Sequence, residues 1–196
     1  SVWDDRSMDS DTSTLDHTKI LLNVGSSPAD DTRVDPRFLQ PPWRMVRVDI
    51  DPTVEPDIVA SITCMSAVKD SSVDAIWSRH NLEHLYHHEV PLALKEFYRV
   101  LRIAGVAMIF LPDLQRVAEH LADGRLEEPL YRSPAGDICA IDMLYGHRES
   151  IRRGNHFMSH RTGFTSHTLR IKLAQAGFSK VQTQRQGFQL MATAQK

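Results

Sequence analysis

The sequence contains little cysteine, no long apolar run and no excess of positive charge. Its two cysteines, Cys64 and Cys139, stand in unrelated contexts, which argues against a disulfide-rich scaffold and against a cysteine-based zinc site. No apolar run approaches the ~20 residues that a membrane-spanning helix needs, and no basic-then-apolar signal segment opens the chain. The formal net charge of -2 argues against binding to a nucleic-acid backbone. We therefore expect a cytoplasmic protein with neither a nucleic-acid partner nor a membrane partner.

The size and composition of the chain are those of a single globular domain. It has 196 residues, of which 41% are apolar and 24% are charged. Residues 1–17 carry five aspartates among serines and threonines and show no apolar periodicity, so we expect a mobile acidic arm. Residues 18–196 are expected to form one domain, in which residues 114–164 are an insertion after the fifth strand.

Short apolar runs that suit strands buried on both faces recur along the chain. The predicted strands are residues 20–24, 44–51, 58–60, 73–78 and 106–111. Apolar periodicity, capping residues and glycines predict helices at residues 91–105, 114–123, 134–146 and 166–176. Residues 179–196 are predicted to be two strands meeting at Gly187. The alternation predicts an α/β fold with a doubly wound, mostly parallel sheet and a C-terminal antiparallel hairpin.

Two residues at strand ends indicate a nucleoside ligand, because ligands bind such sheets beyond the carboxyl ends of the strands. Gly25 follows the first strand, where a missing side chain lets a ligand approach the backbone. Asp49 ends the second strand, 49 − 25 = 24 residues later, and can accept hydrogen bonds from ribose hydroxyls. Asp30 and Asp31 would repel a pyrophosphate, and the chain lacks the three glycines of a dinucleotide site. S-adenosylmethionine, a nucleoside without phosphates, fits better.

Five stretches of the chain resemble class I S-adenosylmethionine-dependent methyltransferases, especially the small type 11 domains. They are "ILLNVGSSP", "VRVDIDP", "VDAIWSRHNLEHL", "LKEFYRVLRIAGVAMIFLPD" and "FTSHTLRIKLAQAGFSKV". The resemblance implies a Rossmann-like methyltransferase fold, S-adenosylmethionine as cofactor and methyl transfer to a small-molecule acceptor. It also implies that residues 79–81 line the cofactor and acceptor pocket. The residues expected to bind the cofactor are Asn23, Val24, Gly25, Ser26, Asp49, Ile50, Ser61, Ile62, His80, Asn81 and Leu82.

The chain departs from the family's pattern at Ile103-Ala104, where Pro-Gly usually precedes the fifth strand, and at three positions near the cofactor. Asn23 stands where the family usually has an acid, Ser27 replaces a second glycine, and Ser61 replaces an acid on the adenine side. These departures leave an alternative hypothesis open, in which the chain is a binding or regulatory protein with this fold and without turnover.

The stretch "HNLEHLYHHE", residues 80–89, raises the alternative of a metal site, because it holds four of the ten histidines. A metal site would need His80, His84 and His87 or His88 on one continuous helix or in a fixed loop. Pro91 favours a helix that begins only after this stretch. We therefore predict no metal, and expect Glu83 and His84 to orient the turn.

Residues 147–164 are a candidate lid over the active site, because they form a long aperiodic segment before the last helix. Their four arginines and one glutamate give 4 − 1 = +3, which favours an anionic or polyhydroxylated acceptor; a solvated loop is the alternative. Of their histidines, we expect His160, and then His156, to act as a general base. Methyl transfer depends mainly on positioning, so it does not require a base.

Overall fold

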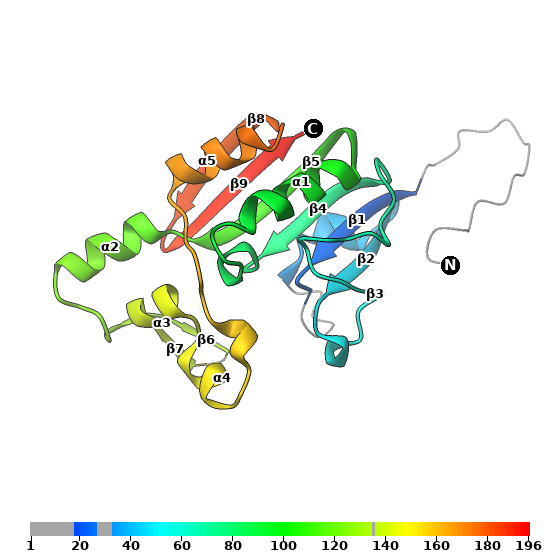
Figure 1. The fold of residues 1–196 in the computed structure, drawn as a ribbon. Coiled ribbons are helices and arrows are strands. Elements are labelled where there is room, and N and C mark those ends of the chain that lie inside the picture. Colours follow the sequence, from blue (N-terminus) through cyan, green and yellow to red (C-terminus); the bar gives the residue numbers. More distant parts are fainter. Residues whose placement is uncertain (1–17, 27–32, 135) are drawn as a thin grey trace, which may run out of the picture.

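The computed structural model describes residues 18–26, 33–134 and 136–196, so the predicted acidic arm at residues 1–17 lies outside the described residues. Its centre is a seven-stranded sheet in the order β3-β2-β1-β4-β5-β9-β8, with a separate group of short elements beside it (Figure 1). The strands are β1 (Lys19–Val24), β2 (Trp43–Asp49), β3 (Ile58–Val59), β4 (Val73–Arg79), β5 (Leu101–Pro112), β8 (Ser179–Gln186) and β9 (Gln189–Gln195). Strands β1 to β5 all run parallel, and β9 runs antiparallel to both its neighbours, β5 and β8. The predicted doubly wound sheet and terminal hairpin are confirmed.

Two helices cover one face of the sheet. Helix α1 (Val90–Val100) buries an apolar stripe formed by Val90, Ala93, Leu94, Phe97 and Val100, the spacing of one helical face. Helix α5 (Ser166–Gln175) begins where the side chain of Thr165 accepts a hydrogen bond from the Thr168 amide. Both helices pack on the inward side chains of alternate strand residues and form the main core with them.

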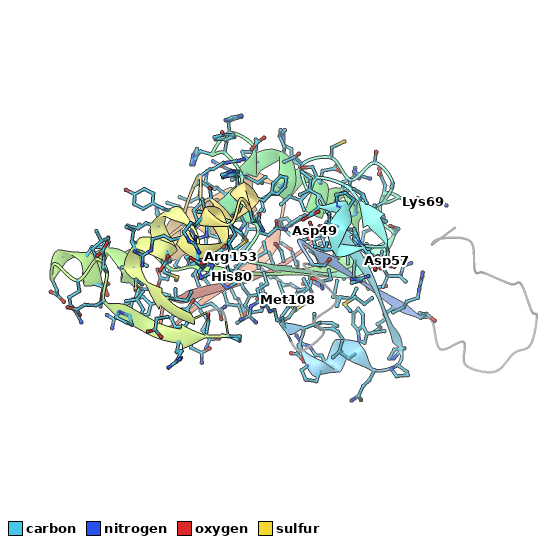
Figure 2. The ribbon with its side chains drawn as sticks, turned by 90° about the horizontal axis from the view of Figure 1, so that it is seen from below. Asp49, Asp57, Lys69, His80, Met108 and Arg153 are labelled. Carbon is cyan, nitrogen blue, oxygen red and sulfur yellow. The ribbon has the colours of Figure 1, made fainter. Side chains whose placement is uncertain are left out.

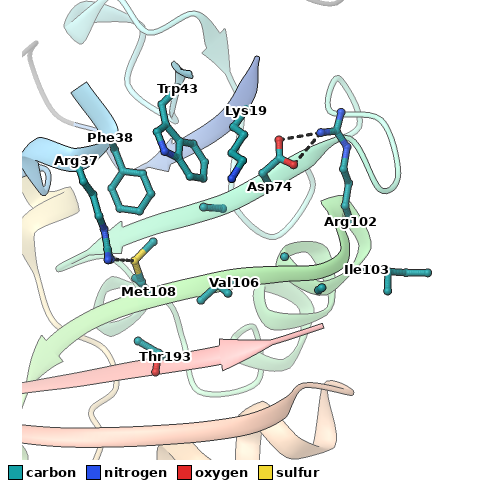
Figure 3. A pocket seen from close by; sticks show the side chains of 13 residues that line it. Lys19, Arg37, Phe38, Trp43, Asp74, Arg102, Ile103, Val106, Met108 and Thr193 are labelled. Carbon is teal, nitrogen blue, oxygen red and sulfur yellow. Dashed lines mark hydrogen bonds and ion pairs between the residues drawn. The ribbon is translucent and has the colours of Figure 1, made fainter. Parts of the chain in front are cut away.

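The opposite face is covered less completely. Between β1 and β2 the described residues contain one short helix, the 3-10 helix η2 (Pro36–Leu39), which packs Phe38 against Trp77 of β4. Two open hollows of about 490 and 500 Å³ lie over this face. The first is near the amino ends of β4 and β5, between Trp43 and the ion pair of Asp74 with Arg102 (Figure 3).

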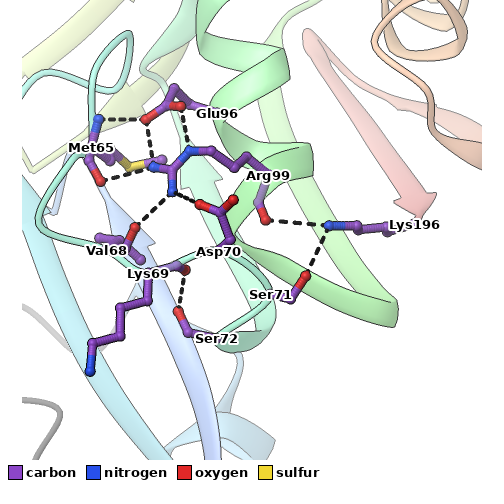
Figure 4. Close-up of polar contacts among 9 residues, drawn as sticks. All are labelled: Met65, Val68, Lys69, Asp70, Ser71, Ser72, Glu96, Arg99 and Lys196. Carbon is purple, nitrogen blue, oxygen red and sulfur yellow. Dashed lines mark hydrogen bonds and ion pairs between the residues drawn. The ribbon is translucent and has the colours of Figure 1, made fainter.

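Helix α1 and the following strand are tied to the loop before β4 by Arg99 (Figure 4). Its guanidinium donates to the carbonyls of Met65 and Val68, at 3.0 and 2.9 Å, and pairs with Asp70 at 2.6 Å. It also pairs with Glu96 one turn earlier, at 2.7 Å. The hydrogen bond with Glu96 and the neighbouring charge of Asp70 raise the pKa of Arg99 above its usual range.

The first predicted helix ends five residues earlier than expected. Helix α1 stops at Val100, and the residues expected to finish it belong to β5, which begins at Leu101. Leu101 is extended (φ -66°, ψ 140°), is fully buried and pairs with Val73 of β4. Burial in the sheet therefore outweighs the helical periodicity that continues through Leu101 in the sequence.

The helix predicted at residues 134–146 is wrong over its first half. The structure has a hairpin of β6 (Pro129–Ser133) and β7 (Gly136–Cys139), followed by the short helix α3 (Ala140–Tyr145). The helix begins here because the carboxylate of Asp142 accepts a hydrogen bond from the Cys139 amide at 2.9 Å, an N-terminal capping box.

These elements belong to the predicted insertion, residues 114–164, together with α2 (Leu114–Ala122), α4 (Arg148–Arg152) and the 3-10 helix η5 (His156–Met158). Asp113 caps α2 as predicted and also pairs with Arg185 of β8. The insertion has a small apolar cluster of its own, formed by Val117, Ala140 and Met143 with partly buried neighbours. Within the described residues, each helix is too short or too polar to span a bilayer.

Candidate functional site

The strand register brings the predicted cofactor-binding residues to one edge of the sheet. Val24 lies opposite Val48 in β2 and opposite Ser78 in β4, so these three strands end side by side. The Gly25 amide donates to the Val48 carbonyl at 2.8 Å, and the His80 amide donates to the carbonyl of Phe110 at 2.9 Å. Asp49 and His80 therefore both follow the carboxyl edge, where the parallel topology places ligands (Figure 2).

Gly25 and Asn81 approach each other across this edge. Gly25 has a left-handed backbone (φ +63°), and a Cβ built on it would lie 2.7 to 2.9 Å from the side-chain atoms of Asn81. Only glycine fits here without displacing Asn81. The Nδ2 atom of Asn81 and the Oγ atom of Ser78 are buried and have no hydrogen-bond partner among the described residues. The edge thus holds two polar groups that make no hydrogen bond among the described residues, next to the backbone of Gly25, which no side chain of its own covers.

Asp49 lies at the end of β2 and is partly exposed. Its Oδ1 atom accepts a hydrogen bond from the Asp51 amide at 3.0 Å, which fixes the carboxylate at the strand end. A carboxylate has about four acceptor positions, so it can still accept hydrogen bonds from a hydroxyl. Asp51 caps the 3-10 helix η3 (Pro52–Val54) through Thr53. On the same side, the Ser61 and Thr63 hydroxyls are 2.8 Å apart.

Several expected cofactor residues point their side chains away from the edge. Val24, Ile62 and Leu82 are buried in the main core, so they support the site from behind. Asn23 is also buried, and its amide lies 3.7 Å from the sulfur of Met45. Ile50 is exposed. Ser26 is partly buried, and its amide lies 3.4 Å from the Val48 carbonyl.

The histidine-rich stretch after β4 divides into two parts. Its first part surrounds Glu83, which lies in the 3-10 helix η4 (Leu82–His84) and is 1% exposed. The Oε1 atom of Glu83 is 3.1 Å from Nδ1 of His80. Its second part is at the surface: His87 contacts Thr162, and His88 stacks on Tyr86.

Of the two candidate bases, His160 reaches this turn and His156 is exposed in η5. The ring of His160 lies 5.0 Å from that of His84, and its Nδ1 is 2.9 Å from the Met143 carbonyl. Burial lowers the pKa of His160, which favours the neutral ring. Burial raises the pKa of Glu83, but the bond with His80 and the nearby charges of His84 and His160 bring it below its usual value. The sequence did not predict that His160 meets Glu83 and His84.

Most arginines of the lid segment are paired within the insertion itself. Arg148 binds the buried Asp142 at 2.9 Å, and Arg152 and Arg153 bind Glu149 at 2.7 and 2.9 Å. The hydrogen bond with Arg152 holds the pKa of Glu149 at about 2. Arg161 instead lies over the Tyr86 ring, 4.7 Å from its centroid. Three of the four arginines are therefore held in ion pairs, and Asp142 offsets one of the three surplus positive charges.

A different arginine lies at the edge of the sheet without a carboxylate partner among the described residues. Arg79 ends β4, is partly buried, and lies 6.0 Å from the Phe110 ring centroid. Burial and the neighbouring charge of Arg33 lower the pKa of Arg79 below its usual value. Arg79 also lines the second hollow, with Trp77 and Phe110. A desolvated guanidinium of this kind is stabilised by an anion.

Comparison with solved structures shows that this fold is shared with S-adenosylmethionine-dependent methyltransferases. A methyltransferase from Archaeoglobus fulgidus is 12% identical with a TM-score of 0.60, over 92% of this chain and 87% of that chain. The 1,6-didemethyltoxoflavin-N1-methyltransferase of Burkholderia thailandensis, solved with S-adenosylhomocysteine, is 19% identical with a TM-score of 0.57, over 90% and 70%. The PH0226 protein of Pyrococcus horikoshii is 13% identical with a TM-score of 0.63, over 93% and 84%.

The family model described as a methyltransferase domain matches residues 30–109. No curated protein matches the sequence. The methyltransferase-domain match covers 109 − 30 + 1 = 80 of the 196 residues, and the fold is one that S-adenosylmethionine-dependent methyltransferases have, in agreement with the sequence resemblance. Both findings support an enzyme.

The residues at the sheet edge fit S-adenosylmethionine. The unused donor at Nδ2 of Asn81 suits a carboxylate or hydroxyl oxygen, and the bare backbone of Gly25 allows close approach. The carboxylate of Asp49 suits ribose hydroxyls.

Proposed function

We propose that this methyltransferase acts on a small acceptor that carries a negative charge, and that Arg79 binds this charge. The observation that carries the proposal is the partly buried Arg79 guanidinium, which no carboxylate of the described residues neutralises. The lid arginines, which first suggested an anionic acceptor, support it less because they are paired with Glu149 and Asp142. The Burkholderia neighbour, solved with bound 1,6-didemethyltoxoflavin, gives an example of a small acceptor on this fold.

The insertion, residues 114–164, is proposed to be the lid over the acceptor. Two of its amides, those of Arg161 and Thr162, donate to the Glu83 carbonyl at 2.8 and 3.2 Å, which holds its last segment on the turn after β4. Its hairpin lies close to the proposed anion site: burial raises the pKa of Tyr131 in β6, and the charge of Arg79 opposes this rise. An acceptor bound at Arg79 would therefore lie near β6 of the insertion.

The chain's contribution to the reaction is mainly positioning. When bound, S-adenosylmethionine supplies an electrophilic methyl group on its sulfonium. In the proposal, Asn81 and the backbone at Gly25 hold its methionine part, and Asp49 holds its ribose. Arg79 then orients the acceptor for in-line attack, which is the effect that most accelerates a displacement of this type.

The predicted role of His160 as a general base has a consistent geometry. A neutral ring whose Nδ1–H donates to the Met143 carbonyl keeps Nε2 as the basic atom. Burial lowers the pKa of His160, so the ring is neutral at pH 7. His156 is the weaker candidate because it is exposed in η5, away from the turn that follows β4.

The test uses acceptors in matched pairs, each a carboxylate or phosphate and its neutral amide or ester. Formation of S-adenosylhomocysteine is followed with the wild-type protein, Arg79→Gln and the control Arg152→Gln. We expect the wild type and R152Q to prefer the charged member at least tenfold, since a charge-assisted hydrogen bond contributes about 1.5–3 kcal/mol. R79Q should lose this preference and still bind S-adenosylhomocysteine normally in calorimetry. Equal turnover of both members by the wild-type enzyme would overturn the proposal.

A further inference from the structure

Three side chains from two distant parts of the chain meet where the insertion contacts the turn after β4. Glu83 and His84 belong to η4, and His160 comes from the end of the insertion, 160 − 84 = 76 residues later. Each offers one potential metal-ligating atom, and these atoms lie within 4.8 Å of one another. We call these three residues the Glu83 cluster.

In each residue of the cluster, one side-chain nitrogen or oxygen makes a hydrogen bond, and the second one makes none among the described residues. Nδ1 of His84 lies 3.2 Å from the Ser159 carbonyl, and Nδ1 of His160 lies 2.9 Å from the Met143 carbonyl. Because a carbonyl only accepts, both histidines carry their proton on Nδ1, and each Nε2 keeps a free lone pair. A ring nitrogen that donates to a carbonyl is the usual support of a metal-ligating histidine.

Glu83 shows the same division between an engaged atom and an unused one. Its Oε1 atom is 3.1 Å from His80 Nδ1. Its Oε2 atom is buried and has no hydrogen-bond partner among the described residues, although the side chain is 1% exposed. An unpaired oxygen of a buried carboxylate is costly unless a cation or a donor meets it. The pairing with His80 accounts for Oε1 and leaves Oε2 unexplained.

We propose that the Glu83 cluster binds one divalent transition-metal ion of the zinc type, through Oε2 of Glu83 and Nε2 of His84 and His160. Two imidazoles and one carboxylate are a ligand set that zinc and its neighbours accept, and three protein ligands leave a position open. Ligands about 2.0–2.2 Å from a zinc ion are about 3.4 Å apart, so the ligand atoms must approach one another by at most about 1.4 Å. This assignment differs from the sequence-based expectation of no metal, which rested on Pro91 starting the helix after the histidine-rich stretch.

The metal site gives His160 a task other than general base, because a ligated Nε2 cannot accept a proton. The ion would join η4 to the insertion through side chains, in addition to the backbone bonds from Arg161 and Thr162 to the Glu83 carbonyl. Its open position would face the region between the lid and the turn after β4. An oxygen of the acceptor is the kind of ligand that such a position takes.

The test is a titration of untagged protein, stripped with a chelator, with Co²⁺ and then Zn²⁺ at pH 7.5. Visible absorption of bound Co²⁺ reports the coordination number, and calorimetry gives the stoichiometry. We expect one Co²⁺ per chain, displaced by Zn²⁺. We expect His84→Gln and His160→Gln to weaken binding at least tenfold each, whereas the control His88→Gln leaves it unchanged.

The variants are checked for folding by circular dichroism and by S-adenosylhomocysteine binding, so that lost metal binding is not confused with lost structure. Should Glu83→Gln fail to fold, the two histidine variants carry the test. The proposal is overturned if the wild type binds no stoichiometric Co²⁺, or if H88Q weakens binding as much as H84Q and H160Q. The metal titration needs no acceptor, so its result is independent of whether the acceptor is anionic.

Discussion

Gly25 and Gly187 have nearly the same left-handed backbone, with φ of +63° and +58°, but different surroundings. A Cβ at Gly25 would lie 2.7 Å from Asn81, whereas a Cβ at Gly187 would meet nothing within 4 Å. A side chain at either glycine would therefore strain the backbone, but only one at Gly25 would also displace Asn81 in the proposed cofactor site.

We expect Gly25→Ala to weaken S-adenosylhomocysteine binding at least tenfold in calorimetry, because it displaces Asn81. Gly187→Ala should carry a similar strain cost, about 1 kcal/mol in unfolding free energy, and leave binding unchanged. Normal binding by G25A would mean that the glycine turn after β1 does not contact the cofactor.

Glu96 makes a contribution to stability that depends on pH. The hydrogen bond from Arg99 lowers the pKa of Glu96 below its ordinary 4.5, with further help from the Met65 amide and against some burial. A carboxyl with a lowered folded-state pKa stabilises the fold fully above about pH 4.5. It loses this contribution as the pH falls through the folded-state value.

Urea unfolding should therefore show Glu96→Gln to be less stable than the wild type by about 1–2 kcal/mol at pH 7. The difference should shrink as the pH falls from 5 toward 3. A constant difference over that range would show that the ionised carboxylate is not what stabilises the loop before β4.

At the scale of elements, Arg99 is the main polar link between α1 and the loop before β4. We expect Arg99→Met to lower the free energy of unfolding by about 2–4 kcal/mol, because it leaves the Met65 and Val68 carbonyls and Glu96 without their donor. The control Arg116→Met removes an exposed pair with Glu119 and should cost less than about 1 kcal/mol. Denaturant midpoints measure both, and equal losses would contradict the assignment.

The sequence predicted the elements of the sheet well because a strand buried on both faces leaves a continuous apolar run. It failed where the sheet or the insertion overrode a helical period. Leu101 continues the period of α1 but pairs with Val73, and the hairpin of β6 and β7 replaces the helix predicted from Ser133. Local signals cannot register such long-range pairings.

The candidate site was predictable to the same degree. Gly25, Asp49 and Asn81 follow strands, and a parallel sheet brings strand ends together without further information. The meeting of His160 with Glu83 and His84 was not predictable, because it depends on the path of the whole insertion. Arg152 and Arg153 stand three and four residues after Glu149, a spacing that predicts ion pairs on a helix. The net charge of the segment does not reveal these pairs.

At the scale of the whole molecule, the insertion and the sheet differ in the size of their cores. The main core joins seven strands, α1 and α5, whereas the separate apolar cluster of the insertion has three buried members. Regions with few buried contacts open at lower free energy than the core.

Hydrogen exchange with mass spectrometry should accordingly show faster exchange in peptides from α3 and α4 than in peptides from β5, under conditions where the fold is intact. After a chelator has removed any Zn²⁺, we expect the amides around η5 to exchange faster still. Added Zn²⁺ should slow their exchange. Uniform protection across the chain would show that the insertion is part of one cooperative unit.

The insertion departs from the sheet and rejoins it at neighbouring points. The Leu114 amide donates to the Phe164 carbonyl at 3.1 Å, and Asp113 forms a bridge with Phe164. A segment whose two ends touch can be excised or exchanged with little loop-closure entropy, because a short linker spans the gap. The segment proposed to cover the acceptor can therefore be exchanged as a unit, and acceptor choice could diverge while the sheet stays unchanged.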